Sequence, residues 1–294
     1  MTADTDITGP DSPDVVGPTQ SDATVVPAGR GRWLAFWGPP FAVLLMVLGL
    51  WYAISYLLLS PERRFLLPPP HAVLQVGFLD PFNLRELLQA LLLSAKVAMA
   101  GLAIAIVIGM ALAIAMSQAR WVERSLYPYA VILQTIPILA LVPLFGFWFG
   151  FGLTSRVLVC VLIALFPIIA DTLFGLRSVE QDHHDLFTLQ NAGRLTRLWK
   201  LQLPAALPAV FTGLRVSAGL SVIGAIVGDF FFKQGEPGIG ILIDLYRSRL
   251  QSEQMFSAII LSSLFGVIVF WFFGLLARRV VGAWHQSARD PTAS

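Results

Sequence analysis

The sequence predicts an all-α integral membrane protein with about six transmembrane helices, and three observations support this fold class. Hydrophobic residues make up 56% of the 294 residues and charged residues only 13%, and the mean hydropathy is +0.73. A soluble domain usually carries about 25% charged residues. The apolar residues form long runs without strict alternation, which is typical of helices that cross lipid. The charged residues cluster between those runs, where a bilayer places them.

Residues 1–32 are acidic, rich in Pro, Thr and Ser, and predicted to be a disordered cytoplasmic tail. They lack the basic start and apolar core of a cleaved signal peptide, so we expect the first transmembrane helix to be retained as an anchor. The rest divides into that helix and an outer loop (33–84), a helical core (85–282) and a cytoplasmic C-terminal tail (283–294).

Six apolar segments are predicted to span the membrane, each close to or above the roughly 20 residues that about 30 Å of hydrocarbon requires. They are 34–59, 87–116, 126–149, 156–176, 206–228 and 256–277. Pro137, Pro143 and three glycines interrupt the third segment and its continuation, so a single straight helix is not expected there. Broken backbone at membrane depth is tolerated where protein or a water-filled cavity surrounds it. This segment therefore either lines a polar pathway or is a kinked span with an interfacial loop.

Basic residues are more frequent in the loops that share a side with the amino terminus, which predicts a multi-pass cell-membrane protein (an inner or plasma membrane) with both termini cytoplasmic. The outer loops would carry Arg63, Arg64, Arg85, Arg156, Lys233, Arg247 and Arg249. The net charge of +2 is too small to indicate nucleic acid, and the single cysteine, Cys160, excludes a disulfide framework. His183 and His184 are adjacent and lack a third ligand at helical spacing, so no metal site is predicted.

The polar stretch 185–208 is the most informative part of the chain. Arg194, Arg197 and Lys200 lie at helical spacing with leucines between them, and the stretch reaches a proline at Pro204. This pattern predicts a short amphipathic helix outside the bilayer, which suits docking into a groove on a partner protein. The alternative is a basic helix that lies on anionic lipid.

A few polar residues fall within the predicted spans. Asp171 is costly in lipid and either faces a cavity or is merely interfacial. Gln134 and Thr135, beside Pro137, either face a polar solute or join helices by hydrogen bonds. Lys96 and Asp229 lie near span boundaries, where a structural role is expected.

These residues resemble a known family, the membrane subunits of binding-protein-dependent ABC importers. The shared cytoplasmic motif of that family is Glu-Ala-Ala, three residues, Gly, nine residues, Ile, one residue and Leu-Pro. Counted back from Leu203-Pro204, the corresponding residues are Asp185-Leu-Phe, Asn191 and Leu201, which depart from the motif although Ala192-Gly193 follows the Asn. Other stretches are similar to the subgroup for nitrate, sulfonates, taurine and pyrimidine-type precursors; they begin at Gln134, Ala140, Trp148, Phe166, Gly213, Gly224 and Gly238.

The resemblance implies a type I ABC importer permease fold, with a coupling loop at 177–205 whose helix sits in a cleft of an ATPase. The residues it assigns to ATPase coupling are Asp185, Asn191, Ala192, Gly193, Arg194, Arg197, Leu198, Trp199, Lys200 and Pro204. Residues proposed for the substrate pathway are Gln134, Thr135, Pro137 and Asp171. The implied partners are a second permease copy, two cytoplasmic ABC ATPase subunits, an extracytoplasmic solute-binding protein and membrane lipid.

The chain lacks a glycine-rich phosphate loop, so no catalytic residue and no cofactor is predicted here, and ATP and Mg²⁺ would be used by the partner ATPase. The solute stays open between small anions such as sulfonates and pyrimidine-type vitamin precursors, with a preference for the latter. One rival hypothesis is a membrane-embedded enzyme that uses Asp171, Asp182, His183 and His184. The other is a non-transporting assembly scaffold, which would leave the broken third segment unexplained.

Overall fold

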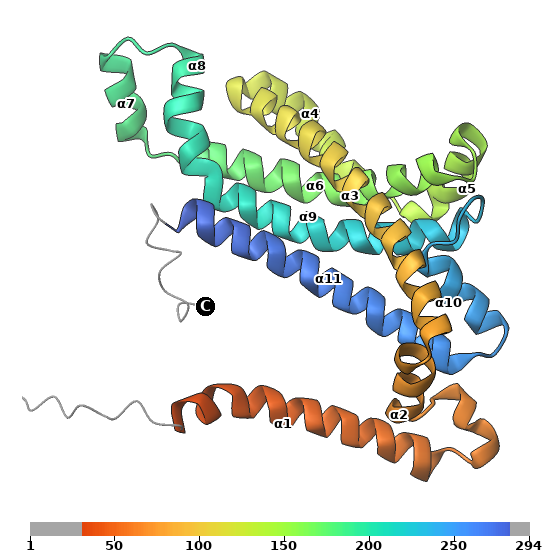
Figure 1. The fold of residues 1–294 in the computed structure, drawn as a ribbon. Coiled ribbons are helices and arrows are strands. Elements are labelled where there is room, and N and C mark those ends of the chain that lie inside the picture. The colour runs from red at the N-terminus through yellow and green to blue at the C-terminus, as the bar shows by residue number, and fades with distance from the viewer. Residues whose placement is uncertain (1–30, 283–294) are drawn as a thin grey trace, which may run out of the picture. The chain divides into compact units, whose positions relative to one another are not determined.

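The computed structural model describes residues 31–282, and every regular element in that range is a helix (Figure 1). The α-helices are α1 (Gly31–Ala53), α2 (Pro70–Val73), α3 (Pro81–Gln118), α4 (Arg120–Thr135), α5 (Ile138–Phe149), α6 (Leu153–Arg177), α7 (Gln181–Leu189), α8 (Arg194–Arg197), α9 (Leu203–Phe231), α10 (Ile239–Ser248) and α11 (Ser252–Val281). Short 3₁₀ or π turns are η1 (Ile54–Leu58), η2 (Pro61–Leu66), η3 (Leu74–Leu79) and η4 (Leu198–Gln202). The two predicted tails lie outside the described residues, apart from the first residues of α1.

The chain forms two units, residues 1–49 and 50–294, which are described separately. Of the first unit the structure describes 31–49, most of helix α1, with Pro39 and Pro40 inside the helix. Phe41, Leu45 and Met46 are each at least 60% exposed. A helix with such apolar side chains on its surface requires lipid or protein around it, as expected of the first span.

Five helical stretches in the described part are long and apolar enough to cross a bilayer: Gly38–Leu58, Pro81–Gln118, Leu153–Arg177, Arg194–Phe231 and Ser252–Val281. Helices α4 and α5 form a pair bent by 98°, which makes a sixth span if it is counted as one. The prediction of about six spans is confirmed. The break falls at Ile136 and Pro137, as the missing N–H of proline predicts.

Helix α3 is longer than the predicted span 87–116. Asp80 accepts a hydrogen bond from the Phe82 N–H at 2.9 Å, and Pro81 occupies the first turn; both features favour a helix start. At 1.5 Å per residue, its 38 residues extend about 57 Å, well beyond the hydrocarbon thickness. Lys96, which we expected near one end of a span, therefore lies well inside a helix.

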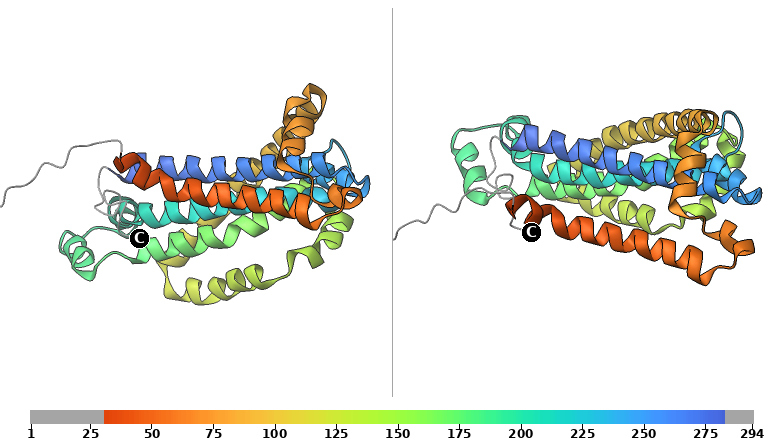
Figure 2. Two further views of the ribbon diagram at one scale, coloured as in Figure 1. Left: turned by 90° about the horizontal axis from the view of Figure 1, so that it is seen from below. Right: turned by 60° about the horizontal axis from the view of Figure 1, so that its bottom comes forward.

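Helices α6, α9 and α11 run side by side, and α3 packs across α6 and α9 (Figures 1 and 2). Lipid provides no hydrophobic drive between helices, so small residues and interhelical hydrogen bonds hold such packing. At Gly224 a Cβ would lie only 2.9 Å from the Cα of Cys160, so α9 approaches α6 as closely as backbone allows. The Ser217 hydroxyl donates to the Ala164 carbonyl at 2.7 Å across the same interface.

Candidate functional site: a coupling segment, pathway residues and a buried polar network

Residues 177–205, here called the coupling segment, connect the carboxyl end of α6 to the amino end of α9. The segment projects beyond one end of the helices, which we call the coupling end (Figure 1). The amino end of α6, the carboxyl end of α9 and helix α10 lie at the opposite end, called the far end.

The stretch 185–208 was predicted to form one short amphipathic helix, and the structure divides it between two helices. Helix α7 ends at Leu189, and a second helix starts at Arg194. This second helix does not stop at Pro204, because Arg194–Phe231 is one continuous helical stretch. Pro204 has no N–H for the carbonyl four residues earlier, and the helix passes the proline just after the π-helical turn η4. Arg194, Arg197 and Lys200 therefore lie in the first turns of the helical stretch that forms the fifth span, and not in a separate helix.

A left-handed residue closes helix α7. Asn191 has a φ of 52°, a conformation that asparagine tolerates better than most residues other than glycine. The Ala192 N–H donates to the Phe187 carbonyl at 2.9 Å, and the Asn191 N–H donates to Thr188 at 3.0 Å. This pair of bonds is a Schellman motif, the usual end of a helix at a left-handed residue. Asn191 is thus the left-handed residue of the turn, at the motif position where the family has glycine. Gly193, two residues later, has an extended backbone.

Arg197 fastens the two helices of the coupling segment together. Its Nε donates to the Ala192 carbonyl at 3.2 Å, and its Nη2 donates to the Thr188 hydroxyl at 3.1 Å. That hydroxyl in turn donates to the His184 carbonyl at 2.9 Å. The guanidinium is thus already engaged within the segment, so Arg197 is poorly placed for the predicted contact with an ATPase.

Of the two large apolar residues assigned to ATPase coupling, Leu198 and Trp199, only Trp199 is exposed. Leu198 is 5% exposed and belongs to the helix core, so it is not available to a partner. Leu195 and Trp199 are 71% and 69% exposed. Two leucines that the sequence interpretation did not select, Leu186 and Leu189, are also exposed on α7.

The remaining predicted coupling residues form few contacts with the rest of the described chain, or only local ones. Arg194 and Lys200 are exposed, and neither forms an ion pair within residues 31–282. Asp185 accepts a hydrogen bond from Gln181 at 3.1 Å within α7. Pro204 lies in the first turn of α9.

The predicted pathway residues fall on two separate elements. Gln134 and Thr135 are exposed at the end of α4, immediately before the bend at Pro137, and the Thr135 hydroxyl donates to the Ile132 carbonyl of its own helix at 2.9 Å. Asp171 is half-buried in α6, and its side chain lies against Gly213 of α9. In the described part of the chain, no hydrogen bond joins Asp171 to Gln134 or Thr135. Their role in a pathway stays a prediction.

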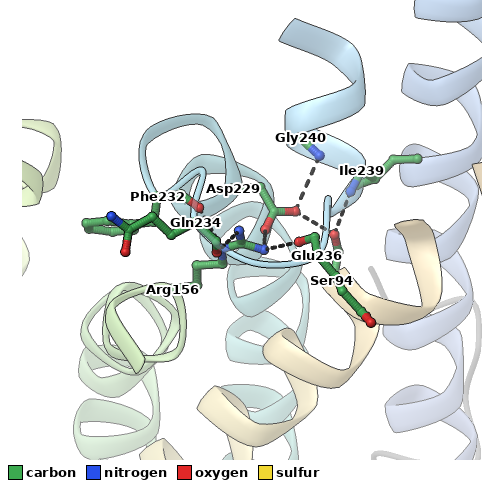
Figure 3. A network of polar contacts seen from close by, with 8 residues as sticks. All are labelled: Ser94, Arg156, Asp229, Phe232, Gln234, Glu236, Ile239 and Gly240. Carbon is green, nitrogen blue, oxygen red and sulfur yellow. Dashed lines mark hydrogen bonds and ion pairs between the residues drawn. The ribbon is translucent and has the colours of Figure 1, made fainter. Parts of the chain in front are cut away.

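A buried polar network lies at the far end, where three helices meet (Figure 3). Arg156 of α6 and Asp229 of α9 are 1% and 0% exposed, and their side chains pair at 3.2 Å from Nη1 to Oδ1. The Ser94 hydroxyl of α3 donates to Asp229 Oδ2 at 2.5 Å and accepts from the Ile239 N–H at 2.8 Å. The Gly240 N–H donates to the same carboxylate oxygen at 3.3 Å.

The other donors of Arg156 hold the loop between α9 and α10. Its Nε donates to the Phe232 carbonyl at 2.8 Å, its Nη2 to Gln234 at 3.0 Å and its Nη1 to Glu236 at 3.2 Å. A buried charge is tolerated when it is paired and hydrogen-bonded. Arg156 meets both conditions, whereas Asp229 Oδ1 has only the ion pair with Arg156 and no hydrogen bond within the described residues. Arg156 therefore fixes the loop 232–238 over the far end of α6.

The same network explains the glycines at the end of this loop and at the start of α10, Gly238 and Gly240. A Cβ on Gly238 would lie 2.0 Å from Asp229 Oδ2, and one on Gly240 would lie 2.4 Å from the Ile226 carbonyl oxygen. Any side chain at either position would displace the carboxylate or the α9 backbone. The sequence stretches that contain Asp229 and Gly238 were both noted as similar to the subgroup. In the structure they pack directly against each other.

The sequence interpretation missed Ser94 and misplaced Arg156. Arg156 was predicted to be an outer-loop charge, and this was wrong, because the structure buries the residue in α6. Asp229 was expected to be structural, and it is the partner of Arg156. The available signal was the recurrence of glycines around an acidic residue at the end of an apolar run, which indicates a crowded, buried carboxylate.

The fold and these sites define a multi-pass helical membrane protein with a polar segment exposed at one end. Residues 105–282, more than half of the chain, match the family described as binding-protein-dependent transport system inner membrane component. The chain belongs to this family and is a permease of the ABC transporter class, with the type I permease fold. Membership implies an ATPase and a binding protein as partners. It decides against the rival hypotheses of an enzyme and of a non-transporting scaffold.

Several characterised permeases are similar to this chain along most of their length. The formylaminopyrimidine transport permease protein of Halalkalibacterium halodurans is 34% identical over 233 residues, covering 79% of this chain and 90% of the relative. The riboflavin transport system permease protein of Chloroflexus aurantiacus is 33% identical over 258 residues, covering 88% and 93%. The taurine transport system permease protein of Escherichia coli is 29% identical over 251 residues, covering 82% and 88%.

Proposed function

We propose that two copies of this permease form the solute pathway of an ATP-driven importer, and that the coupling segment docks on a cytoplasmic ATPase subunit that uses ATP and Mg²⁺. The observation that supports docking is the set of large apolar side chains exposed on the coupling segment. Leu186 and Leu189 share one face of α7, and Leu195 and Trp199 share one face of the next helix, by their spacing. Such side chains exposed together mark an interaction site.

The orientation follows from the distribution of charge. Within the described residues, basic side chains gather at the coupling end: Arg120, Arg124, Arg177, Arg194, Lys200, Arg278 and Arg279. Among these, Arg177 pairs with Glu123. At the far end Arg156 is buried, Lys233 and Arg247 are both paired with Asp244, and four basic residues form no ion pair with the described part of the chain: Arg63, Arg64, Arg85 and Arg249. An excess of free positive charge on one side favours the cytoplasm for that side. The coupling segment and both termini then lie in the cytoplasm of the cell.

The solute is proposed to be a heteroaromatic vitamin or vitamin precursor. The relatives named for formylaminopyrimidine and riboflavin are 34% and 33% identical over 79% and 88% of this chain. The taurine permease is 29% identical over 82% of the chain, and a nitrate permease is 32% identical over only 62%. A small sulfonate is the second candidate.

The docking role can be tested by substitutions of the exposed apolar residues. Leu195→Asp and Trp199→Asp should each weaken binding of the tagged ATPase subunit, measured by co-purification and by uptake into proteoliposomes. An apolar hot spot contributes about 2 kcal/mol or more, which is about thirtyfold in the dissociation constant. Thr196→Asp, on another face of the same exposed turn, is the matched control. Normal assembly and uptake in both apolar variants would contradict docking through this surface.

A further inference from the structure

A polar cleft at the far end lies beside the buried polar network. One wall is a stripe of α3 that contains Glu86, Gln89 and Lys96, whose spacing places them on one helix face. The opposite wall is Glu236 and Pro237 of the loop, with Leu242 of α10. The cavity measures about 500 Å³, within the range of roughly 300–1,000 Å³ that small-molecule sites occupy.

The charged groups of this cleft do not neutralise one another. Within residues 31–282, neither Lys96 nor the Glu236 carboxylate takes part in an ion pair or a side-chain hydrogen bond, and both side chains are exposed. Glu86 accepts one bond, from the Tyr246 hydroxyl at 2.9 Å. One ammonium and two carboxylates thus converge on the cavity with most of their hydrogen-bonding capacity unused.

The loop wall of the cleft is held rigidly from behind. Arg156 binds the Gln234 and Glu236 carbonyls, and a second cavity of about 380 Å³, lined by Arg156 and the loop, shares Leu93 and Glu236 with the first. A recognition site needs side chains on a backbone that is held in place, because a mobile backbone does not keep them at the distances that a bound solute requires. The network in Figure 3 supplies that support.

We infer that the cleft of Glu86, Gln89, Lys96 and Glu236 is a solute-recognition site, which rests on the proposed function and names the class of solute. The ammonium of Lys96 offers donors to a carbonyl, ring nitrogen or carboxylate, and the two carboxylates accept from amino groups. Two carboxylates outnumber one ammonium, so a simple anion such as nitrate is disfavoured. The site fits a small uncharged or zwitterionic molecule that carries both amino donors and hydrogen-bond acceptors; an aminopyrimidine is such a molecule.

The test uses the full complex of permease, ATPase and binding protein in proteoliposomes. The probes are radiolabelled formylaminopyrimidine, riboflavin, taurine and nitrate. Lys96→Ala and Glu236→Gln should each lower uptake of the preferred probe about tenfold, the loss of about 1.4 kcal/mol. Assembly and ATP hydrolysis stimulated by the binding protein should stay within about twofold, because the coupling end is untouched. Lys96→Arg should retain most uptake, and Arg85→Ala, on the same helix but outside the cleft, should match the wild type.

The outcomes separate this inference from the proposed function. Uptake by the wild type that Lys96→Ala and Glu236→Gln leave unchanged would overturn the recognition site while the importer stands. A wild-type preference for nitrate would overturn the solute class. An assembled wild-type complex that transports none of the four probes and shows no stimulated ATP hydrolysis would refute the importer itself.

Discussion

Replacement of Arg156 by methionine should strongly destabilise the far end of the permease. Methionine fills a similar length of space in the core but cannot donate a hydrogen bond. Asp229, which is 0% exposed, would keep only the Ser94 hydroxyl and the Gly240 N–H as partners. Removing one member of a buried ion pair typically costs about 3–5 kcal/mol, because the other charge is left uncompensated. The carbonyls of the loop 232–238 also lose their donor, although water reaches the exposed ones.

The loss of stability is expected to come from the Asp229 carboxylate that is left buried without a partner, and not from the loss of the ion pair itself. Asp229→Leu keeps the branching of the side chain and removes the carboxylate, so Arg156→Met combined with Asp229→Leu should be less damaging than the sum of the single variants. A coupling energy of about 1–3 kcal/mol is expected in the double-mutant cycle. Recovery should be incomplete, because Ser94 and Gly240 lose their acceptor.

The assay is the apparent melting temperature of the purified complex, together with its inactivation half-life at a fixed temperature, since membrane complexes often unfold irreversibly. Arg177→Met is the matched control: it breaks the exposed Arg177–Glu123 pair, whose arginine side chain is 42% exposed. An exposed pair contributes about 1 kcal/mol or less. Equal, small effects of Arg156→Met and Arg177→Met would refute the reasoning about the network.

Three further substitutions test other features of the fold. Asn191→Val should destabilise the coupling segment by about 1–2 kcal/mol, because a branched residue resists the left-handed conformation, whereas Asn191→Gly should be close to neutral; proteolysis rates at the α7–α8 turn measure this. The pKa of Asp244 lies below its usual range because Lys233, and then Arg247, donate to its carboxylate. The stability advantage of the wild type over Asp244→Asn should therefore be full above the unfolded Asp pKa of about 3.9 and disappear as the pH falls through the lower folded value, which thermal unfolding at several pH values can follow. Gly224→Val should cost about 1–3 kcal/mol by overpacking α9 against Cys160, seen as a lower melting temperature.

Each of these has a contrary outcome. Equal proteolysis of the Val and Gly variants at Asn191 would mean that the turn is not strained. If the stability advantage of the wild type over Asp244→Asn grew as the pH fell, the lowered pKa of Asp244 would be contradicted. Gly219→Val, at a position where a Cβ has nothing within 4 Å, is the control for Gly224→Val, and equal losses would argue against close helix contact.

The broad fold could be predicted because the membrane imposes it locally. Long uncharged runs must be helices that satisfy their own backbone groups, so the spans followed from composition alone. The break before Ile138 was equally local, since Pro137 removes an N–H wherever it sits. The start of α3 was less visible, because the cap at Asp80 lies in a polar stretch that hydropathy assigns to a loop.

The site was harder to predict because its partners are distant along the chain. A charge count assumes that Arg156 faces water, and only the meeting of α3, α6 and α9 shows that it pairs with Asp229, which in turn accepts a hydrogen bond from Ser94. The coupling segment was misjudged for a related reason: the spacing of Arg194, Arg197 and Lys200 indicates a helix but does not show whether it is separate from the span after it. Asn191 was a better candidate for the turn than Gly193, since the family motif places its glycine there.

Helix α9 connects the two ends of the permease. Leu195 in α8 and Trp199 in η4, which precede α9 in the same continuous helical stretch, belong to the surface that is proposed to meet the ATPase, and Asp229 in the last turn of α9 belongs to the buried network. The continuous helical stretch Arg194–Phe231 has 38 residues and extends about 57 Å, so it links a displacement at one end to the other. The Arg197 contacts join α7 to this helical stretch, and at its other end Asp229 accepts hydrogen bonds from Ser94 of α3 and from the Gly240 N–H of α10. Under the proposed function, movement of the coupling segment therefore reaches the walls of the polar cleft directly, without any chain of side-chain rearrangements through the middle of the membrane.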